Sequence, residues 1–228
     1  MRGFAEIYDM AAGHHGGAGA LETRITAQPY GPPLSDDPAS LPDDRWLSAF
    51  TRFVFSAGFN WKVIENKWNG FEEAFDRFDV ARCAMMSDED LDRHLANRAI
   101  VRHATKILSV RDNAVFLIDL AREHGKPAGA VLGSWPPQDY VGLLDLLKKR
   151  GSRLGGTTAQ YALRFIGMPS LVLSRDVVAA LVREGVIDRA PTGKAAMRSV
   201  QDAVNAWMAE SGRGLTEISK VLAFSVGP

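Results

Sequence analysis

Apolar residues recur at helical spacing along most of the chain, and no alternation long enough for a sheet interrupts them. The clearest example surrounds a glycine-containing turn. Apolar side chains share one face before the turn and again after it, at Tyr140, Leu143, Leu144 and Leu147, then at Ala159, Ala162, Leu163 and Ile166. This pattern predicts two short helices joined by a tight turn, an αα-hairpin at about residues 138–167 that ends at Gly167.

The same spacing, read with cap signals, predicts further helices. They are a helix from Asp43 to Gly58, short helices after Asp79 and Ser87, a long helix stopped by Gly125, a helix between Ser174 and Gly185, and two final helices through Trp207 and Leu222. The predicted fold class is all-α, a helical bundle.

The first part of the chain has a different character. Prolines and a Ser-Asp-Asp sequence between Gln28 and Pro42 indicate an extended connector. We expect residues 1–42 to form an arm packed on the body and residues 43–228 to form one helical domain. The His14-His15 pair is more typical of a solvated loop than of a metal site, because no further ligand lies nearby.

Composition limits the class of protein. The 228 residues are 46% hydrophobic and 24% charged, as in soluble globular proteins. No apolar run is long enough to span a membrane, and the first residues lack the apolar region of a signal peptide, so a cytoplasmic location is expected.

The one cysteine, Cys83, excludes an internal disulfide and argues against a cysteine-based zinc site. A net charge of zero argues mildly against a nucleic-acid binder, although a local basic strip remains compatible with it.

The hairpin turn has the features of a phosphate site. Gly155 and Gly156 can adopt positive φ, and the amides of Gly156, Thr157 and Thr158 would open a helix, where an anion is favoured. Four cations lie beside this turn, namely Lys148, Lys149, Arg150 and Arg153. The alternative is an ordinary turn in a helical bundle whose cations are simply solvated. Similarly, Arg102, His103 and Lys106 are candidates for a second phosphate strip, or for a solvated helical face.

Four segments, in order over about residues 45–167, resemble type I 3-methyladenine DNA glycosylases. They are residues 56–61 (Ser-Ala-Gly-Phe-Asn-Trp), 71–79 (Phe-Glu-Glu-Ala-Phe-Asp-Arg-Phe-Asp), 100–107 (Ile-Val-Arg-His-Ala-Thr-Lys-Ile) and 150–158 (Arg-Gly-Ser-Arg-Leu-Gly-Gly-Thr-Thr). The resemblance implies the helix-hairpin-helix DNA glycosylase superfamily, in which the hairpin grips a phosphate of duplex DNA while a flipped base enters a pocket. It implies no cofactor, and we expect a monomer.

The resemblance also assigns roles to residues. Trp61 would stack on the base, with Asn60 and Phe53 beside it, although core packing is the alternative for Trp61. The phosphate would be held by Lys149, Arg150, Arg153, Gly155, Gly156, Thr157 and Thr158. The catalytic aspartate corresponds to Asp176, or the position falls on Ser174. A carboxylate at Asp176 is also favourable simply because it lies in the first turn of a helix.

Three departures from the family shape the functional hypothesis. Thr157 stands where bifunctional relatives have a Schiff-base lysine, which predicts monofunctional chemistry. Phe53 stands where the family has the glutamate that reads the base, and the cysteines of the family's zinc clamp are missing, so no metal is expected. The predicted function is a DNA repair glycosylase acting on an alkylated or altered purine. The alternatives are a DNA- or lesion-binding protein that does not cleave, and a helical protein unrelated to DNA.

Overall fold

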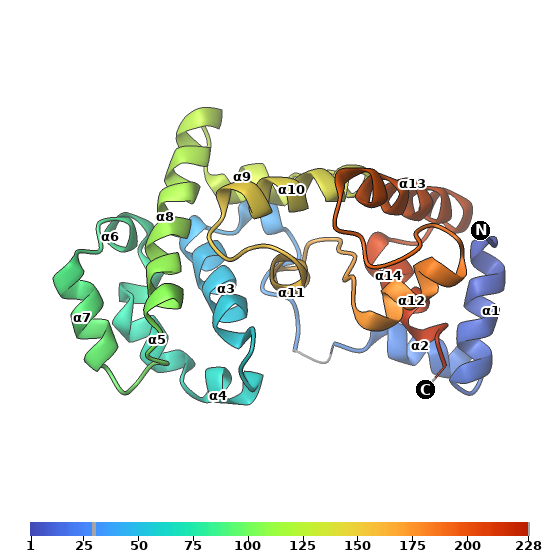
Figure 1. Ribbon diagram of the computed structural model, residues 1–228, viewed down its shortest axis with the longest axis horizontal. Coiled ribbons are helices and arrows are strands. Elements are labelled where there is room, and N and C mark those ends of the chain that lie inside the picture. Colours follow the sequence, from blue (N-terminus) through green and yellow to red (C-terminus); the bar gives the residue numbers. More distant parts are fainter. Residues whose placement is uncertain (29–30, 228) are drawn as a thin grey trace. The chain divides into compact units, whose positions relative to one another are not determined.

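The computed structural model describes residues 1–28 and 31–227, and this part of the chain contains helices and no strand (Figure 1). The all-α prediction is therefore confirmed. The α-helices are α1 (Phe4–His14), α2 (Ala18–Thr26), α3 (Asp43–Ser56), α4 (Trp61–Asn66), α5 (Trp68–Ala74), α6 (Val80–Ala84), α7 (Asp88–Ala96), α8 (Ala104–His124), α9 (Ala128–Gly133), α10 (Tyr140–Arg150), α11 (Thr157–Ile166), α12 (Arg175–Arg183), α13 (Lys194–Ser211) and α14 (Leu215–Phe224). Short 3₁₀ turns are η1 (Pro38–Ser40), η2 (Asp76–Phe78) and η3 (Pro137–Asp139).

The chain forms two compact units. One contains residues 1–32, 136–142 and 169–228, and the other contains residues 33–135 and 143–168. These units divide the chain at places other than residue 42, because α1 and α2 belong with the last three helices. The expected arm over residues 1–42 and single domain over residues 43–228 stay a prediction.

The unit of residues 33–135 and 143–168 is built around α3 and α8. Helix α3 packs against α8 and α11, while α6, α7 and α9 also contact α8 (Figure 1). The side chains of Trp46, Phe50 and Phe55 on α3 are fully buried, as are Ile107 and Leu117 on α8. Burial of such aromatic and aliphatic groups is the main stabilising contribution to this unit.

Helix ends in this unit follow the local chemistry of the sequence. Ser87 and Asp90 form a reciprocal capping box at the start of α7, and the Asp79 carboxylate accepts a bond from the Arg82 amide at the start of α6. Gly125 and Gly167 adopt left-handed conformations that end α8 and α11. Helices α10 and α11 occupy the two stretches in which the helices of the hairpin are predicted.

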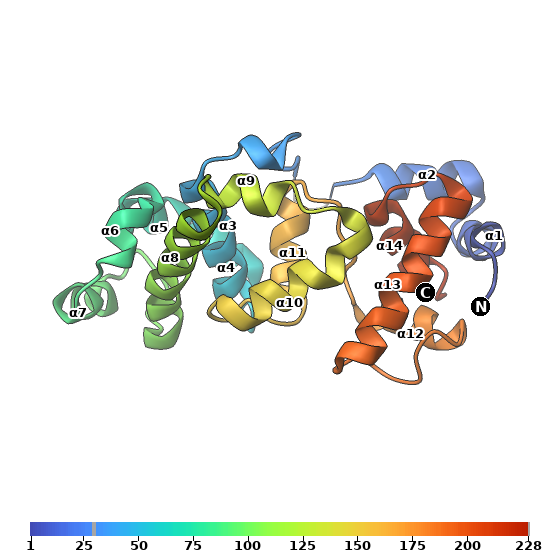
Figure 2. The ribbon, with the colours of Figure 1, turned by 90° about the horizontal axis from the view of Figure 1, so that it is seen from above.

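In the other unit, α14 packs against α1, α12 and α13, and Figure 2 shows this group from above. The buried Glu184 accepts hydrogen bonds from the Arg2 and Arg183 guanidinium groups at 2.9 and 2.8 Å. Burial alone would raise the pKa of Glu184, but these bonds outweigh it and hold the pKa below its usual value. Glu184 thus connects the first residues of the chain to the end of α12.

Two further findings concern the cysteine and the hydrophobicity of the helices. The Cys83 side chain is buried, and burial raises the pKa of its thiol to about 12. In the described ranges, no helix combines the length and hydrophobicity that a bilayer crossing requires.

Candidate functional site

The turn between α3 and α4 exposes a group of large apolar side chains. Helix α3 ends at Ser56, Gly58 has φ +78°, and the Asn60 side chain caps α4 by accepting a bond from the Lys62 amide at 3.0 Å. Trp61 is the first residue of α4, and 46% of it is exposed, with Phe59 and Val63 exposed to a similar extent. Large aromatic side chains are mostly buried in folded proteins, so a half-exposed indole at a helix start is a feature that the packing of the core does not explain.

Lys106 lies behind this turn. It is only 3% exposed, and its ammonium donates to the carbonyl oxygens of Phe55 at 3.1 Å and Ala57 at 2.6 Å. The nitrogen also lies 4.6 Å from the centre of the Phe59 ring. Burial, together with the nearby Arg153 guanidinium, lowers the pKa of Lys106. The interpretation of Lys106 as part of a solvated face or phosphate strip was wrong, because its charge is used to cap the last turn of α3.

The hairpin turn has the expected open helix end. Helix α11 begins at Thr157 with Gly156 as its N-cap, and no side chain caps it. Gly156 has φ +59° and ψ −143°, a conformation largely restricted to glycine. The second positive φ in this turn belongs to Arg153, at +63°, and not to Gly155. The first amides of α11 lack intrahelical partners by geometry, which suits an anion.

The hairpin cations differ in how they are held. Arg150 makes a bidentate ion pair with Glu123 at 2.6 and 2.7 Å, and Lys149 pairs with Asp145 at 2.5 Å. Arg153 reaches the Thr105 hydroxyl at 3.5 Å and is otherwise exposed. An exposed ion pair contributes little to stability, so exchanging its carboxylate for a phosphate costs little.

Phe53 faces helix α11. Its ring is nearly parallel to that of Tyr161, at 8° with centres 6.5 Å apart, and it contacts Phe165 at 5.5 Å. The position that the resemblance aligns with the family's base-reading glutamate is therefore part of an aromatic contact in this chain and carries no charge.

Asp176 and Ser174 lie in the other compact unit, at the start of α12. The Ser174 hydroxyl oxygen accepts a bond from the Val177 amide at 3.3 Å and so acts as the N-cap, as expected. Asp176 is exposed in the first turn. The carboxylate is consequently accessible, whereas the serine hydroxyl is committed to the helix.

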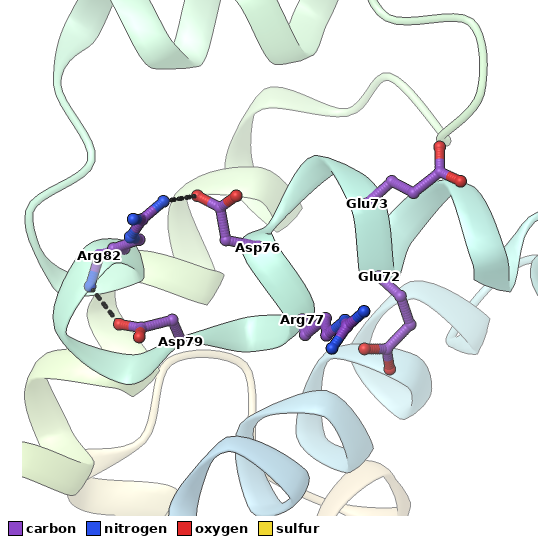
Figure 3. A pocket seen from close by; sticks show the side chains of 6 residues that line it. All are labelled: Glu72, Glu73, Asp76, Arg77, Asp79 and Arg82. Carbon is purple, nitrogen blue, oxygen red and sulfur yellow. Dashed lines mark hydrogen bonds and ion pairs between the residues drawn. The ribbon is translucent and has the colours of Figure 1, made fainter.

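A surface hollow over α5, η2 and α6 contains none of the expected site residues. Figure 3 shows its lining, which is formed by Glu72, Glu73, Asp76, Arg77, Asp79 and Arg82. Four carboxylates against two guanidinium groups make this a poor site for DNA. Its wall is a left-handed turn, with φ of +50°, +55° and +62° at Asp76, Arg77 and Phe78. The buried Phe78 ring holds it by stacking on Trp68 at 5.6 Å.

Part of the chain is similar in sequence to known proteins. Residues 43–134 match the model of the methyladenine glycosylase family. Over this region the chain is similar to methyladenine glycosylases. It is 27% identical over 124 residues to DNA-3-methyladenine glycosylase 1 of Escherichia coli, covering 46% of this chain and 66% of that protein. It is 33% identical over 58 residues to DNA-3-methyladenine glycosylase of Haemophilus influenzae, covering 25% and 31% of the two chains.

The match thus spans less than two thirds of the length of each of these curated relatives. A crystal structure of 3-methyladenine DNA glycosylase I aligns with a TM-score of 0.47 and 25% identity, covering 55% of this chain and 79% of that one. The family region extends from α3 to α9 and includes Phe53, Trp61 and Lys106, but it stops before the hairpin and before Asp176. The resemblance seen in the sequence is confirmed for this region.

Proposed function

We propose that the protein is a monofunctional DNA glycosylase that hydrolyses the N-glycosidic bond of an alkylated or otherwise altered purine in duplex DNA. The observation that carries the proposal is the exposed Trp61 at the α3–α4 turn, within the family-matched region. The open N-terminus of α11, in the same compact unit, adds a second support as a phosphate site. A monomer acting in the cytoplasm is part of the proposal.

Trp61 holds the flipped base in this mechanism. Aromatic–base stacking contributes about 1–3 kcal/mol per base and needs no specific hydrogen bonds. An alkylated purine that carries positive charge is further attracted to the ring face. The same charge makes the base a good leaving group, so little acid catalysis is required.

Asp176 is the residue that we assign to catalysis. As the bond between C1′ and the purine nitrogen breaks, both electrons leave with the base and positive charge develops on the sugar. A carboxylate stabilises that charge and orients the water whose oxygen then bonds to C1′, with its proton released to solvent or base. Thr157 has no amine, so no Schiff base forms and the DNA strand is left intact.

The phosphate contacts assigned to the hairpin are Lys149, Arg150, Arg153 and the backbone from Gly155 to Thr158. Such contacts set affinity without reading sequence and make it dependent on salt. Arg150 and Lys149 would exchange their carboxylate partners, Glu123 and Asp145, for the DNA backbone.

The alternative function is binding of DNA or of a lesion without cleavage, and one observation favours it. Phe53 replaces the base-reading carboxylate and packs on Tyr161 and Phe165. Loss of that group removes recognition of a cationic base while leaving the hairpin intact.

Incubation of the purified protein with methylated duplex DNA distinguishes the two functions. Free methylated purine is separated by chromatography, and binding is measured on the same duplex. Release of base from the methylated duplex, and none from the unmodified duplex, supports the glycosylase. Binding without release selects the alternative, and neither binding nor release contradicts both.

A further inference from the structure

Helix α8 carries two buried polar side chains whose hydrogen bonds leave the helix. Lys106 and Asn113 are 3% and 1% exposed, and neither bonds within its own helix through its side chain. Asn113 follows Lys106 by seven residues, which is about two helical turns and a rise of ~10 Å, so both lie on the same side of α8. Buried polar groups in phase with an apolar stripe cost free energy unless their bonds are made.

Lys106 satisfies the end of α3. The last carbonyl groups of a helix have no intrahelical partner, and the ammonium takes two of them, those of Phe55 and Ala57. Ala57 directly precedes Gly58, and Trp61 begins α4 three residues later. The ammonium therefore fixes the point from which the base-holding turn, residues 57–61, departs.

Asn113 holds the hairpin turn in a comparable way. Its side-chain oxygen accepts from the Ser152 amide at 2.8 Å, and its side-chain nitrogen donates to the Ser152 carbonyl at 3.1 Å. Both main-chain groups of Ser152 are thus used, directly before Arg153 with its positive φ. The neighbouring Leu154 is buried, which fixes the same turn on its apolar side.

We propose that Lys106 and Asn113 are positioning residues, through which α8 sets the separation between the base-holding turn and the phosphate-binding turn, residues 152–158. This inference rests on the proposed function, since it assigns the two turns to base and phosphate. It goes further in predicting that two buried polar contacts of one helix have separable effects. Lys106 governs base release, and Asn113 governs DNA affinity.

A purely structural role gives a different pattern. If the two side chains only stabilise the fold, losing either one lowers the melting temperature and reduces binding and release in the same proportion. Ser109 provides the matched control, because it lies between them on α8 and is 1% exposed. Its hydroxyl bonds only to the Lys106 carbonyl of the same helix, at 2.7 Å.

The test compares Lys106→Met, Asn113→Ala and Ser109→Ala with the wild-type protein. Equilibrium binding to methylated duplex, the single-turnover rate of base release at saturating protein, and the melting temperature are measured for each. Breaking a buried hydrogen bond costs about 1–3 kcal/mol, which corresponds to roughly a 5- to 150-fold effect. We expect Lys106→Met to slow release by about tenfold or more with affinity within about threefold, and Asn113→Ala to show the reverse. Ser109→Ala should change neither.

Equal losses of binding and release in both variants, or the same losses in Ser109→Ala, overturn the proposal. Lys106→Arg, which keeps a cationic donor, should recover part of the release rate if Lys106→Met folds poorly. No recovery by a folded Lys106→Arg counts against the positioning role.

Backbone hydrogen exchange separates this inference from the proposed function. If the wild-type protein neither binds nor releases base, the functional proposal fails while exchange still reports on the two turns. Lys106→Met should then speed exchange in residues 57–61 alone, and Asn113→Ala in residues 152–158 alone. Faster exchange throughout the unit in either variant refutes local positioning.

Discussion

Replacement of Gly156 by valine is the sharpest test of the hairpin as phosphate anchor. Gly156 has φ +59° and ψ −143°, and an added Cβ would meet no atom within 4 Å. The substitution therefore introduces backbone strain without a steric clash at Cβ. Because Gly156 is the N-cap of α11, the chain relieves that strain by rotating the amides that we assign to phosphate.

The size of the effect follows from the backbone conformation. A non-glycine residue in such a sparsely populated region costs about 1–3 kcal/mol, and a β-branched side chain is among the least tolerant. If the bound hairpin must adopt the observed geometry, this cost appears in the binding free energy. Affinity for duplex DNA should fall by roughly 5- to 150-fold.

Fluorescence anisotropy on methylated and unmodified duplexes over a range of salt concentrations provides the assay. Binding should weaken equally on both duplexes, because phosphate contacts carry no sequence information. Gly193→Val is the matched control, since Gly193 is the N-cap of α13, has φ −107° and its added Cβ would also meet no atom within 4 Å. If Gly156→Val binds as tightly as Gly193→Val, the hairpin is not the phosphate anchor.

Four further predictions follow from the described geometry. Trp61→Ala should weaken capture of the modified base by about 1–3 kcal/mol, measured as the difference in affinity between methylated and unmodified duplexes, and an unchanged difference would show that Trp61 does not stack. Asp176→Asn should slow base release by ~10²-fold, and equal rates for variant and wild type would show that Asp176 serves only at the start of its helix. Borohydride should trap no covalent DNA adduct of the wild-type protein, because Thr157 has no amine. Elemental analysis should find no stoichiometric zinc in the purified protein, since its one cysteine and five histidines do not supply the usual closely placed ligands. The pKa of Glu184 is held below its usual 4.5, so its contribution to stability is present above pH 4.5 and is lost as the pH falls through the lower, folded-state pKa. As the pH is lowered from above 4.5, the melting temperature of Glu184→Gln should therefore fall less steeply than that of the wild-type protein.

Much of the helical framework was readable from local sequence. Gly125 and Gly167 stop their helices because they adopt left-handed conformations without a Cβ penalty, and Ser87 with Asp90 forms a capping box from side chains three residues apart. The two helices of the hairpin were also predictable, since apolar residues recur at helical spacing on both sides of one glycine-containing turn. These signals are local, so no tertiary information was needed.

The partners of polar side chains were not readable in the same way. The prediction of Lys106 as a surface cation is wrong, because Lys106 is in phase with the buried Val110, Asn113 and Leu117, a stripe that predicts an inward direction. That phase gives direction only. The identity of its acceptors depends on where α3 ends against α8, which is set by packing between distant parts of the chain. The positive φ at Arg153 is also not predictable from the sequence, because Gly155 and Gly156 lie two and three residues later and glycine is the residue type that usually adopts positive φ.

The burial of Cys83 affects how the protein reacts with methylating agents. Such reagents attack thiolates far faster than thiols, and with a pKa of about 12 the Cys83 side chain is almost entirely the neutral thiol at pH 7. Only 4% of the residue is accessible to solvent, and its sulfur lies 3.6 Å from the Phe75 carbonyl oxygen, to which the thiol donates. As the sequence contains no other cysteine, the protein offers almost no ionised thiol to the chemistry that damages its proposed substrate.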